Sequence, residues 1–183
     1  MSDVDLQSSG SRLNIEIKAR SSDHEGLRKV LQHRGARCVG LDHQVDTYFQ
    51  VPSGRLKLRE GTIENSLIFY QRPNQAGPKQ SDVLLVRLSP DPALKALLTA
   101  SNGVKVVIDK QREIWFDGNV KLHLDRVEGL GLFVEIEAID ADGSFSIQDL
   151  QVQCKAYMDL FAIRDADLVE QSYSDLLLDM QAR

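Results

Sequence analysis

The sequence predicts an α+β fold in which eight antiparallel β-strands close into a barrel, or tunnel, with a charged interior and helices packed on the outside. Three observations favour this fold. Segments in which apolar and polar residues alternate recur along the chain, and this is the period of a β-strand. One face of these segments is apolar, whereas the other carries many of the charged residues. Segments with helical periodicity accompany them, and their apolar stripes can cover the apolar face.

The first strand, at about residues 13–19, sets the pattern for the others. Asn14, Glu16 and Lys18 share one face, and Ile15 and Ile17 share the opposite face. Turn-forming Gly, Pro, Asn and Asp residues separate several of the later strands. These strands are expected at residues 44–50, 55–59, 66–72, 82–88, 104–116, 120–126 and 132–139.

Four helices are expected. The first follows a capping box formed by Ser22 and Glu25 and ends at Gly35. The second opens at Ser89–Pro92 and ends before Gly103. The third begins after Ser144 or Ser146 and carries an apolar stripe, and the last is a short helix at residues 172–178.

The polar faces of the strands contain more cations than anions. In the third strand, Arg55, Lys57 and Arg59 share a face, which on its own is also typical of an exposed edge strand protected from aggregation. In the seventh strand, His123 shares a face with Asp125 and Lys121. The candidate cations are Lys18, Arg55, Lys57, Arg59, Arg72, Arg87, Lys110 and Arg112. The candidate anions are Glu16, Asp125, Glu135 and Glu137.

An interior with this excess of cations needs an anion, because buried charges are costly unless they are paired. Polyphosphate suits Arg and Lys, which bind it through charge-assisted hydrogen bonds. Carboxylates are hard oxygen ligands, so Glu16, Glu135 and Glu137 suit Mg²⁺ or Mn²⁺. The alternative is an open sheet whose charged face forms cross-strand pairs in water.

Composition narrows the classes of partner. The 183 residues carry a net charge of -5 and a pI near 5.4, so the bulk surface should attract neither nucleic acid nor an anionic membrane. No apolar run approaches the roughly 20 residues of a membrane helix. Cys38 and Cys154 lack metal-ligand spacing, and we expect two reduced, half-buried thiols in a cytoplasmic protein. Residues 1–12 are expected to be a disordered leader before a single domain at residues 13–183.

The strand motifs resemble those of a known family. Asn14-Ile15-Glu16-Ile17-Lys18 resembles the Glu-x-Glu-x-Lys signature of the CYTH superfamily, the triphosphate tunnel metalloenzymes. The alternation from Arg55 to Arg59 is similar to the third strand of the family. Lys110-x-Arg112, Asp125 and Glu135-x-Glu137 then follow in the family's order. The resemblance covers about residues 13–178 and implies an eight-stranded tunnel that binds a triphosphate and a divalent metal.

The resemblance also implies roles for individual residues. The implied metal ligands, for Mg²⁺ or Mn²⁺, are Glu16, Glu135 and Glu137. The implied phosphate-binding residues are Lys18, Lys57, Arg59, Arg72, Arg87, Lys110 and Arg112. Lys18, Arg112 and Asp125 are the implied catalytic residues. Asn14 departs from the signature, because an amide oxygen lacks the charge of the family's first Glu, and one metal site is therefore weaker.

The resemblance is closest to the class IV adenylate cyclases, which implies conversion of ATP to cyclic AMP and pyrophosphate. Hydrolysis of inorganic tripolyphosphate or thiamine triphosphate is the alternative, because both reactions rely on positioning and charge stabilisation. A non-catalytic module that binds polyphosphate or nucleotide is the second alternative. The expected partner is a small-molecule triphosphate, without nucleic acid or membrane, and the sequence leaves a homodimer open.

Overall fold

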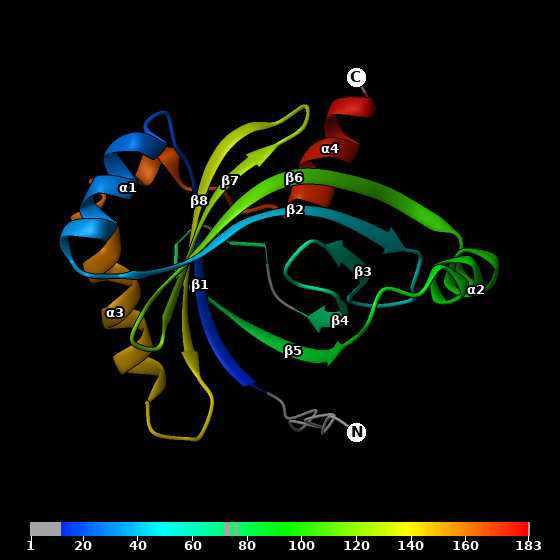
Figure 1. The fold of residues 1–183 in the computed structure, drawn as a ribbon, viewed down its shortest axis with the longest axis horizontal. Helices are drawn as coiled ribbons and strands as arrows, with labels where there is room; N and C mark the ends of the chain where they lie inside the picture. Colours follow the sequence, from blue (N-terminus) through cyan, green and yellow to red (C-terminus); the bar gives the residue numbers. More distant parts are fainter. Residues whose placement is uncertain (1–11, 72–73, 76, 183) are drawn as a thin grey trace.

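A computed structural model describes residues 12–71, 74–75 and 77–182 of the chain (Figure 1). Within these residues eight strands form a closed barrel in the order β1-β5-β4-β3-β2-β6-β7-β8, and every neighbouring pair is antiparallel. The strands are β1 (Arg12–Arg20), β2 (Arg37–Phe49), β3 (Arg55–Gly61), β4 (Ser66–Gln71), β5 (Lys79–Arg87), β6 (Val104–Asp117), β7 (Val120–Val127) and β8 (Gly131–Asp140). The predicted antiparallel barrel is confirmed.

Helices pack on the outside of this barrel, as expected. The helices are α1 (His24–His33), α2 (Pro92–Asn102), α3 (Ile147–Leu160) and α4 (Tyr173–Gln181), with a short 3₁₀ helix at Asp165–Asp167. Figure 1 shows α1 and α3 together on one side, α2 at the opposite end and α4 near β6. Among the described helices, none has both the length and the hydrophobicity of a membrane-spanning segment.

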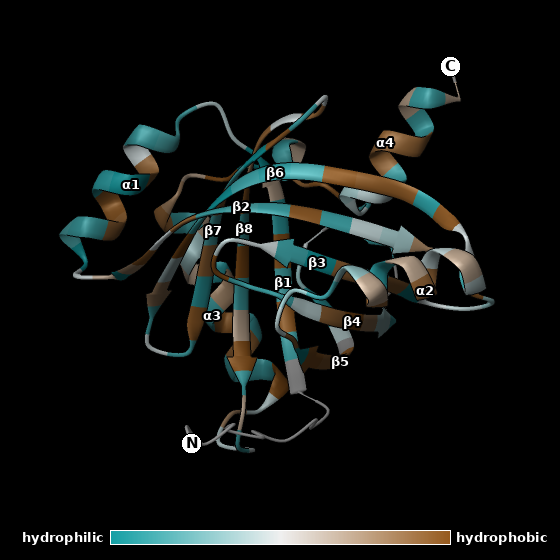
Figure 2. Cartoon of the chain, turned by 45° about the vertical axis from the view of Figure 1, so that its right-hand side comes forward, coloured by the Kyte–Doolittle hydropathy of each residue, from teal (hydrophilic) through white to brown (hydrophobic). Residues whose placement is uncertain are grey.

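Many apolar strand residues point outward and form the core with these helices, whereas Leu84 and Val86 of β5 are exposed. Ile15 and Ile17 of β1 are buried in one cluster with Leu31 of α1 and with Leu150 and Cys154 of α3. A smaller cluster joins strands β2 and β3 to α2, and its buried members are Phe49, Leu58 and Leu98. Figure 2 shows the alternation of hydrophobic and hydrophilic residues along the strands. Burial of the outer apolar faces leaves the polar faces to line the inside.

Two local predictions differ from the structure. The side chain of Asp23, not that of Ser22, caps α1, because its Oδ1 accepts a hydrogen bond from the Gly26 backbone N–H at 2.7 Å. Strand β2 begins seven residues before the expected start, and its pairing with β6 shifts register between Cys38 and Gly40. Gly40 lies in the positive-φ region (φ 145°), which interrupts the sequence pattern of a strand.

The two cysteines and the start of the first strand also differ from the prediction. Cys38 is exposed and Cys154 is fully buried, so the expectation of two half-buried thiols is wrong. The Cys154 Sγ donates to the Ile15 carbonyl at 3.2 Å, and burial raises the pKa of this thiol to about 12. Of the predicted leader, residues 1–11 lie outside the described part of the chain, and Arg12 already belongs to β1.

Candidate functional site

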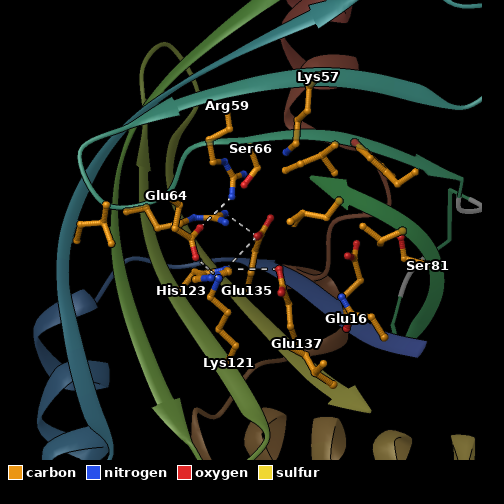
Figure 3. Close-up of a pocket in the computed structure, with 18 of the residues that line it drawn as sticks. Glu16, Lys57, Arg59, Glu64, Ser66, Ser81, Lys121, His123, Glu135 and Glu137 are labelled. Carbon is orange, nitrogen blue, oxygen red and sulfur yellow. Dashed lines mark hydrogen bonds and ion pairs between the residues drawn. The ribbon is translucent and has the colours of Figure 1, made fainter. Parts of the chain in front are cut away.

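A cavity of about 680 Å³ lies inside the barrel and is lined by the polar faces of the strands (Figure 3). Alternation along each strand explains this, because residues two apart point to the same side. The predicted site residues that line the cavity are Glu16, Lys18, Lys57, Arg59, Arg87, Lys110, Arg112, Glu135 and Glu137. The charged faces therefore converge on a cavity inside the closed barrel, and the alternative of an open sheet is wrong.

Three other predicted positions lie elsewhere. Arg55 forms an ion pair with Asp175 of α4 at 2.7 Å. Asp125 is fully buried and forms hydrogen bonds next to the cavity. Arg72 lies outside the described residues. Tyr70 of β4 also lines the cavity.

Asp46 of β2 binds three of the predicted phosphate-binding cations. Its carboxylate accepts hydrogen bonds from Lys57 at 2.9 Å, from Arg59 at 2.8 and 3.0 Å, and from Lys110 at 2.7 Å. Burial opposes ionisation of Asp46, but the three cations outweigh it and hold its pKa well below the usual range. The sequence analysis did not identify Asp46 as a site residue. Its position two residues after Gln44 nevertheless places both polar side chains on one face of this strand.

Glu64 enters the cavity from the loop between β3 and β4 (residues 62–65). One carboxylate oxygen lies 2.5 Å from the Lys121 Nζ, and the other lies 3.2 Å from an Arg59 nitrogen. Burial opposes ionisation, but Lys121, Arg59 and His123 lower the pKa of Glu64. Neither Glu64 nor Lys121 was predicted as a site residue. Asp46 and Glu64 add two carboxylates to the interior, and Arg37 and Lys121 add two cations. Because Arg55 is paired with Asp175 and does not line the cavity, the excess of positive charge is smaller than the sequence indicated.

The three predicted catalytic residues belong to one buried network. Arg112 donates to both oxygens of Asp125, at 2.7 and 2.5 Å, and also to Glu135 at 2.6 Å. The other Glu135 oxygen lies 3.0 Å from the Lys18 Nζ. Tyr173, at the start of α4, donates to Asp125 at 2.7 Å, and its ring centroid lies 3.9 Å from the Lys18 Nζ. Tyr173 was not predicted, because it reaches the barrel from outside the strand pattern.

A candidate metal site lies beside this network. His123, Glu135 and Glu137 each offer a ligand atom, and these atoms all lie within 4.8 Å of one another. Glu16 lines the same cavity and is paired with Glu137 across β1 and β8, but it is not part of this cluster of described residues. Burial and the nearby Arg112 lower the pKa of His123, which favours a neutral ring with a free lone pair. Two carboxylates and a neutral imidazole form a donor set that fits a divalent cation.

Comparisons with known proteins agree with this geometry. The sequence profile of the CYTH domain family matches residues 12–155. Adenylate cyclase CyaB of Aeromonas hydrophila is 26% identical over 173 residues, which cover 90% of this chain and 88% of that protein.

Two solved structures share the fold. PH1012 protein of Pyrococcus horikoshii OT3 has a TM-score of 0.75 and 23% identity, covering 89% of this chain and 98% of that one. A candidate adenylate cyclase of Vibrio parahaemolyticus has a TM-score of 0.75 and 20% identity. The match covers 92% of this chain and 99% of that one.

Proposed function

Since this chain belongs to the CYTH domain family, whose members are generally metal-dependent, we propose that it is an enzyme that converts ATP to cyclic AMP and pyrophosphate. The observation that carries the proposal is the cavity inside the barrel, in which cations face the cluster of His123, Glu135 and Glu137. Cations of this kind bind phosphate groups, and the acidic cluster suits the metal that accompanies them. The similarity to the Aeromonas cyclase supports the choice of reaction.

The cations divide into two groups along the cavity. Lys57, Arg59 and Lys110 meet at Asp46, and a bound triphosphate would compete with this carboxylate for them. Lys18 and Arg112 instead meet at Glu135, which belongs to the candidate metal site. We assign the first group to binding the phosphates that leave as pyrophosphate. Arg87, at the end of β5, also lines the cavity, and we assign it to binding the same phosphates.

Lys18 and Arg112 are assigned to the reacting phosphate. Their positive charges, fixed by buried partners, would stabilise the negative charge that develops when the ATP 3′-hydroxyl attacks the α-phosphate. Asp125 acts as a positioning residue in this scheme, because its oxygens bind Arg112 and Tyr173. Mg²⁺ or Mn²⁺, held by Glu135 and Glu137 with Glu16 nearby, would supply further positive charge to the phosphate oxygens.

An apolar wall favours a substrate with an organic group. Ile68 of β4 and Val83 and Leu85 of β5 line the cavity, together with the rings of Tyr48 and Tyr70. Inorganic tripolyphosphate would make no use of this wall, whereas a nucleobase can pack against it. The same wall also suits the thiazole and pyrimidine rings of thiamine triphosphate, so hydrolysis of that compound is the second candidate.

Turnover of a substrate panel tests the proposal. The purified protein is incubated with ATP, thiamine triphosphate or tripolyphosphate in Mg²⁺ or Mn²⁺, and cyclic AMP, pyrophosphate and phosphate are measured separately. We expect cyclic AMP and pyrophosphate in equal amounts from ATP. Phosphate release alone would replace the cyclase with a triphosphatase, and tight binding without turnover would indicate a binding module.

A pair of lysine variants adds a matched control. Lys18→Ala should lower kcat/KM by about 100-fold, because it removes a charge next to the reacting group. Lys155→Ala, on the exposed surface of α3, should leave the rate unchanged. Equal rates for the two variants would remove Lys18 from the site.

A further inference from the structure

His123 is a buried histidine whose ring lacks the usual hydrogen bonds. Only 1% of its surface is exposed, and neither ring nitrogen has a hydrogen-bond partner among the described residues. Burying a polar group without a partner costs free energy, so buried histidines are normally bonded to a carbonyl or a carboxylate. An imidazole without hydrogen bonds in a polar cavity therefore indicates that a bound group interacts with one of its ring nitrogens.

The surroundings of His123 specify that ligand. Strand pairing places His123 of β7 directly opposite Glu135 of β8. The Nδ1 atom lies 3.4 Å from a Glu135 oxygen and 3.6 Å from a Glu137 oxygen, which is too far for good hydrogen bonds. Ligands at about 2.1 Å from a shared metal ion are themselves about 3 Å apart on adjacent octahedral positions. Figure 3 shows the three side chains from neighbouring strands pointing into the same part of the cavity.

We propose that His123 is a direct ligand of the divalent cation, which is therefore held by one imidazole nitrogen and the carboxylates of Glu135 and Glu137. The inference rests on the metal-dependent function proposed above and adds a nitrogen to the predicted all-oxygen set.

Imidazole is a poor ligand for Mg²⁺ but a good one for first-row transition metals. The site should therefore bind Mn²⁺ more tightly than Mg²⁺, and Co²⁺ more tightly than Mn²⁺.

Pulsed electron paramagnetic resonance on Mn²⁺ tests the proposal without reference to activity. The full chain, without an affinity tag, is loaded with less than one equivalent of Mn²⁺, and binding is checked by titration. Spin-echo modulation from a directly bound ¹⁴N nucleus is expected. It should change to the ¹⁵N pattern when the protein is made with ¹⁵N-labelled histidine, which identifies the nitrogen as imidazole without any substitution.

Two variants then identify the histidine. His123→Asn should abolish the nitrogen modulation and weaken Mn²⁺ binding by tenfold or more, with a smaller change for Mg²⁺. His33→Asn, at the exposed end of α1, should behave as the unaltered protein. Circular dichroism checks that both variants are folded.

Bound Mn²⁺ without nitrogen modulation in the unaltered protein would overturn the proposal, as would modulation that persists in folded His123→Asn. In either case, metal-dependent turnover of a triphosphate would leave the proposed function standing. Conversely, nitrogen modulation without turnover of any triphosphate would refute the catalytic function. The assignment of His123 as a metal ligand would then still hold.

Discussion

Lys110 shows how a single buried residue can make ligand binding depend on pH. Its ammonium group lies 2.7 Å from Asp46, in a part of the barrel that also holds Arg59, Arg112 and Lys57. Burial and these three cations lower its pKa to about 7, despite the attraction of Asp46. The residue is therefore charged below neutral pH and loses its charge above it.

The contribution of Lys110 to the affinity for tripolyphosphate should consequently fall as the pH rises. The protonated form attracts the anion, so the affinity contributed by Lys110 should decrease about tenfold between pH 6 and pH 8.5. Calorimetric titration of the unaltered protein and of Lys110→Gln measures this, and the comparison cancels the ionisation of tripolyphosphate itself. Identical pH profiles for the two proteins would show that Lys110 does not titrate in this range.

The β3–β4 loop is the element that most changes the cavity. Asp42 of β2, which is fully buried, accepts hydrogen bonds from the backbone N–H groups of Ile63 at 2.8 Å and Glu64 at 3.0 Å. It also accepts one from the Thr62 hydroxyl at 2.9 Å. These bonds hold the loop against the barrel with the Glu64 carboxylate inside, where it occupies Arg59 and a neighbouring lysine.

Glu64→Gln should strengthen tripolyphosphate binding by about three- to tenfold. The carboxylate competes with phosphate for Arg59 and Lys121, and the amide does not carry the competing charge. Glu60→Gln is the control, because Glu60 pairs with the half-exposed Lys95. Binding constants from titration decide the matter. Weaker binding in Glu64→Gln would mean that Glu64 orients Arg59 for the ligand instead of competing with it.

The strands were predictable from sequence because alternation is a local property. The period of two in β1, β3, β6 and β8 is enough to place Lys18, Arg59, Arg112 and Glu135 on one face. The cap of α1 was not predictable in the same way, because Ser21, Ser22 and Asp23 are all good capping residues in consecutive positions.

The partners of the cations were harder to predict than the cations. Asp46 lies opposite Arg59 only through the register of β2 and β3, which neither strand's own pattern specifies. Glu64 comes from a loop that has no period, and Tyr173 comes from a helix distant in sequence. The sequence thus identified both members of the Lys18–Glu135 and Arg112–Asp125 pairs. Of the pairs made by Asp46 it identified only the cations, because that pairing depends on tertiary structure.

At the scale of the whole molecule, the closed barrel is stable only if its interior charges are neutralised. Asp46 is the carboxylate partner that three cations share, so Asp46→Asn should destabilise the fold by about 3–5 kcal/mol. Added tripolyphosphate should restore more stability to this variant than it adds to the unaltered protein, because the phosphates replace the lost charge.

Thermal unfolding with and without tripolyphosphate measures both effects. Asp109→Asn is the control, because Asp109 is half-exposed and pairs with the half-exposed His43. A variant that is destabilised but gains no extra protection from the anion would show that the ligand binds elsewhere.

The closure of the barrel through β1 also has a consequence for biosynthesis. This strand pairs with both β5 and β8, so the first of the eight barrel strands to be synthesised acquires its last neighbour only when β8 has been made. Until then at least one of its edges is open to wrong partners on the nascent chain or on other chains. Slow, late ring closure is therefore the step at which chaperones would have most effect on this protein's yield.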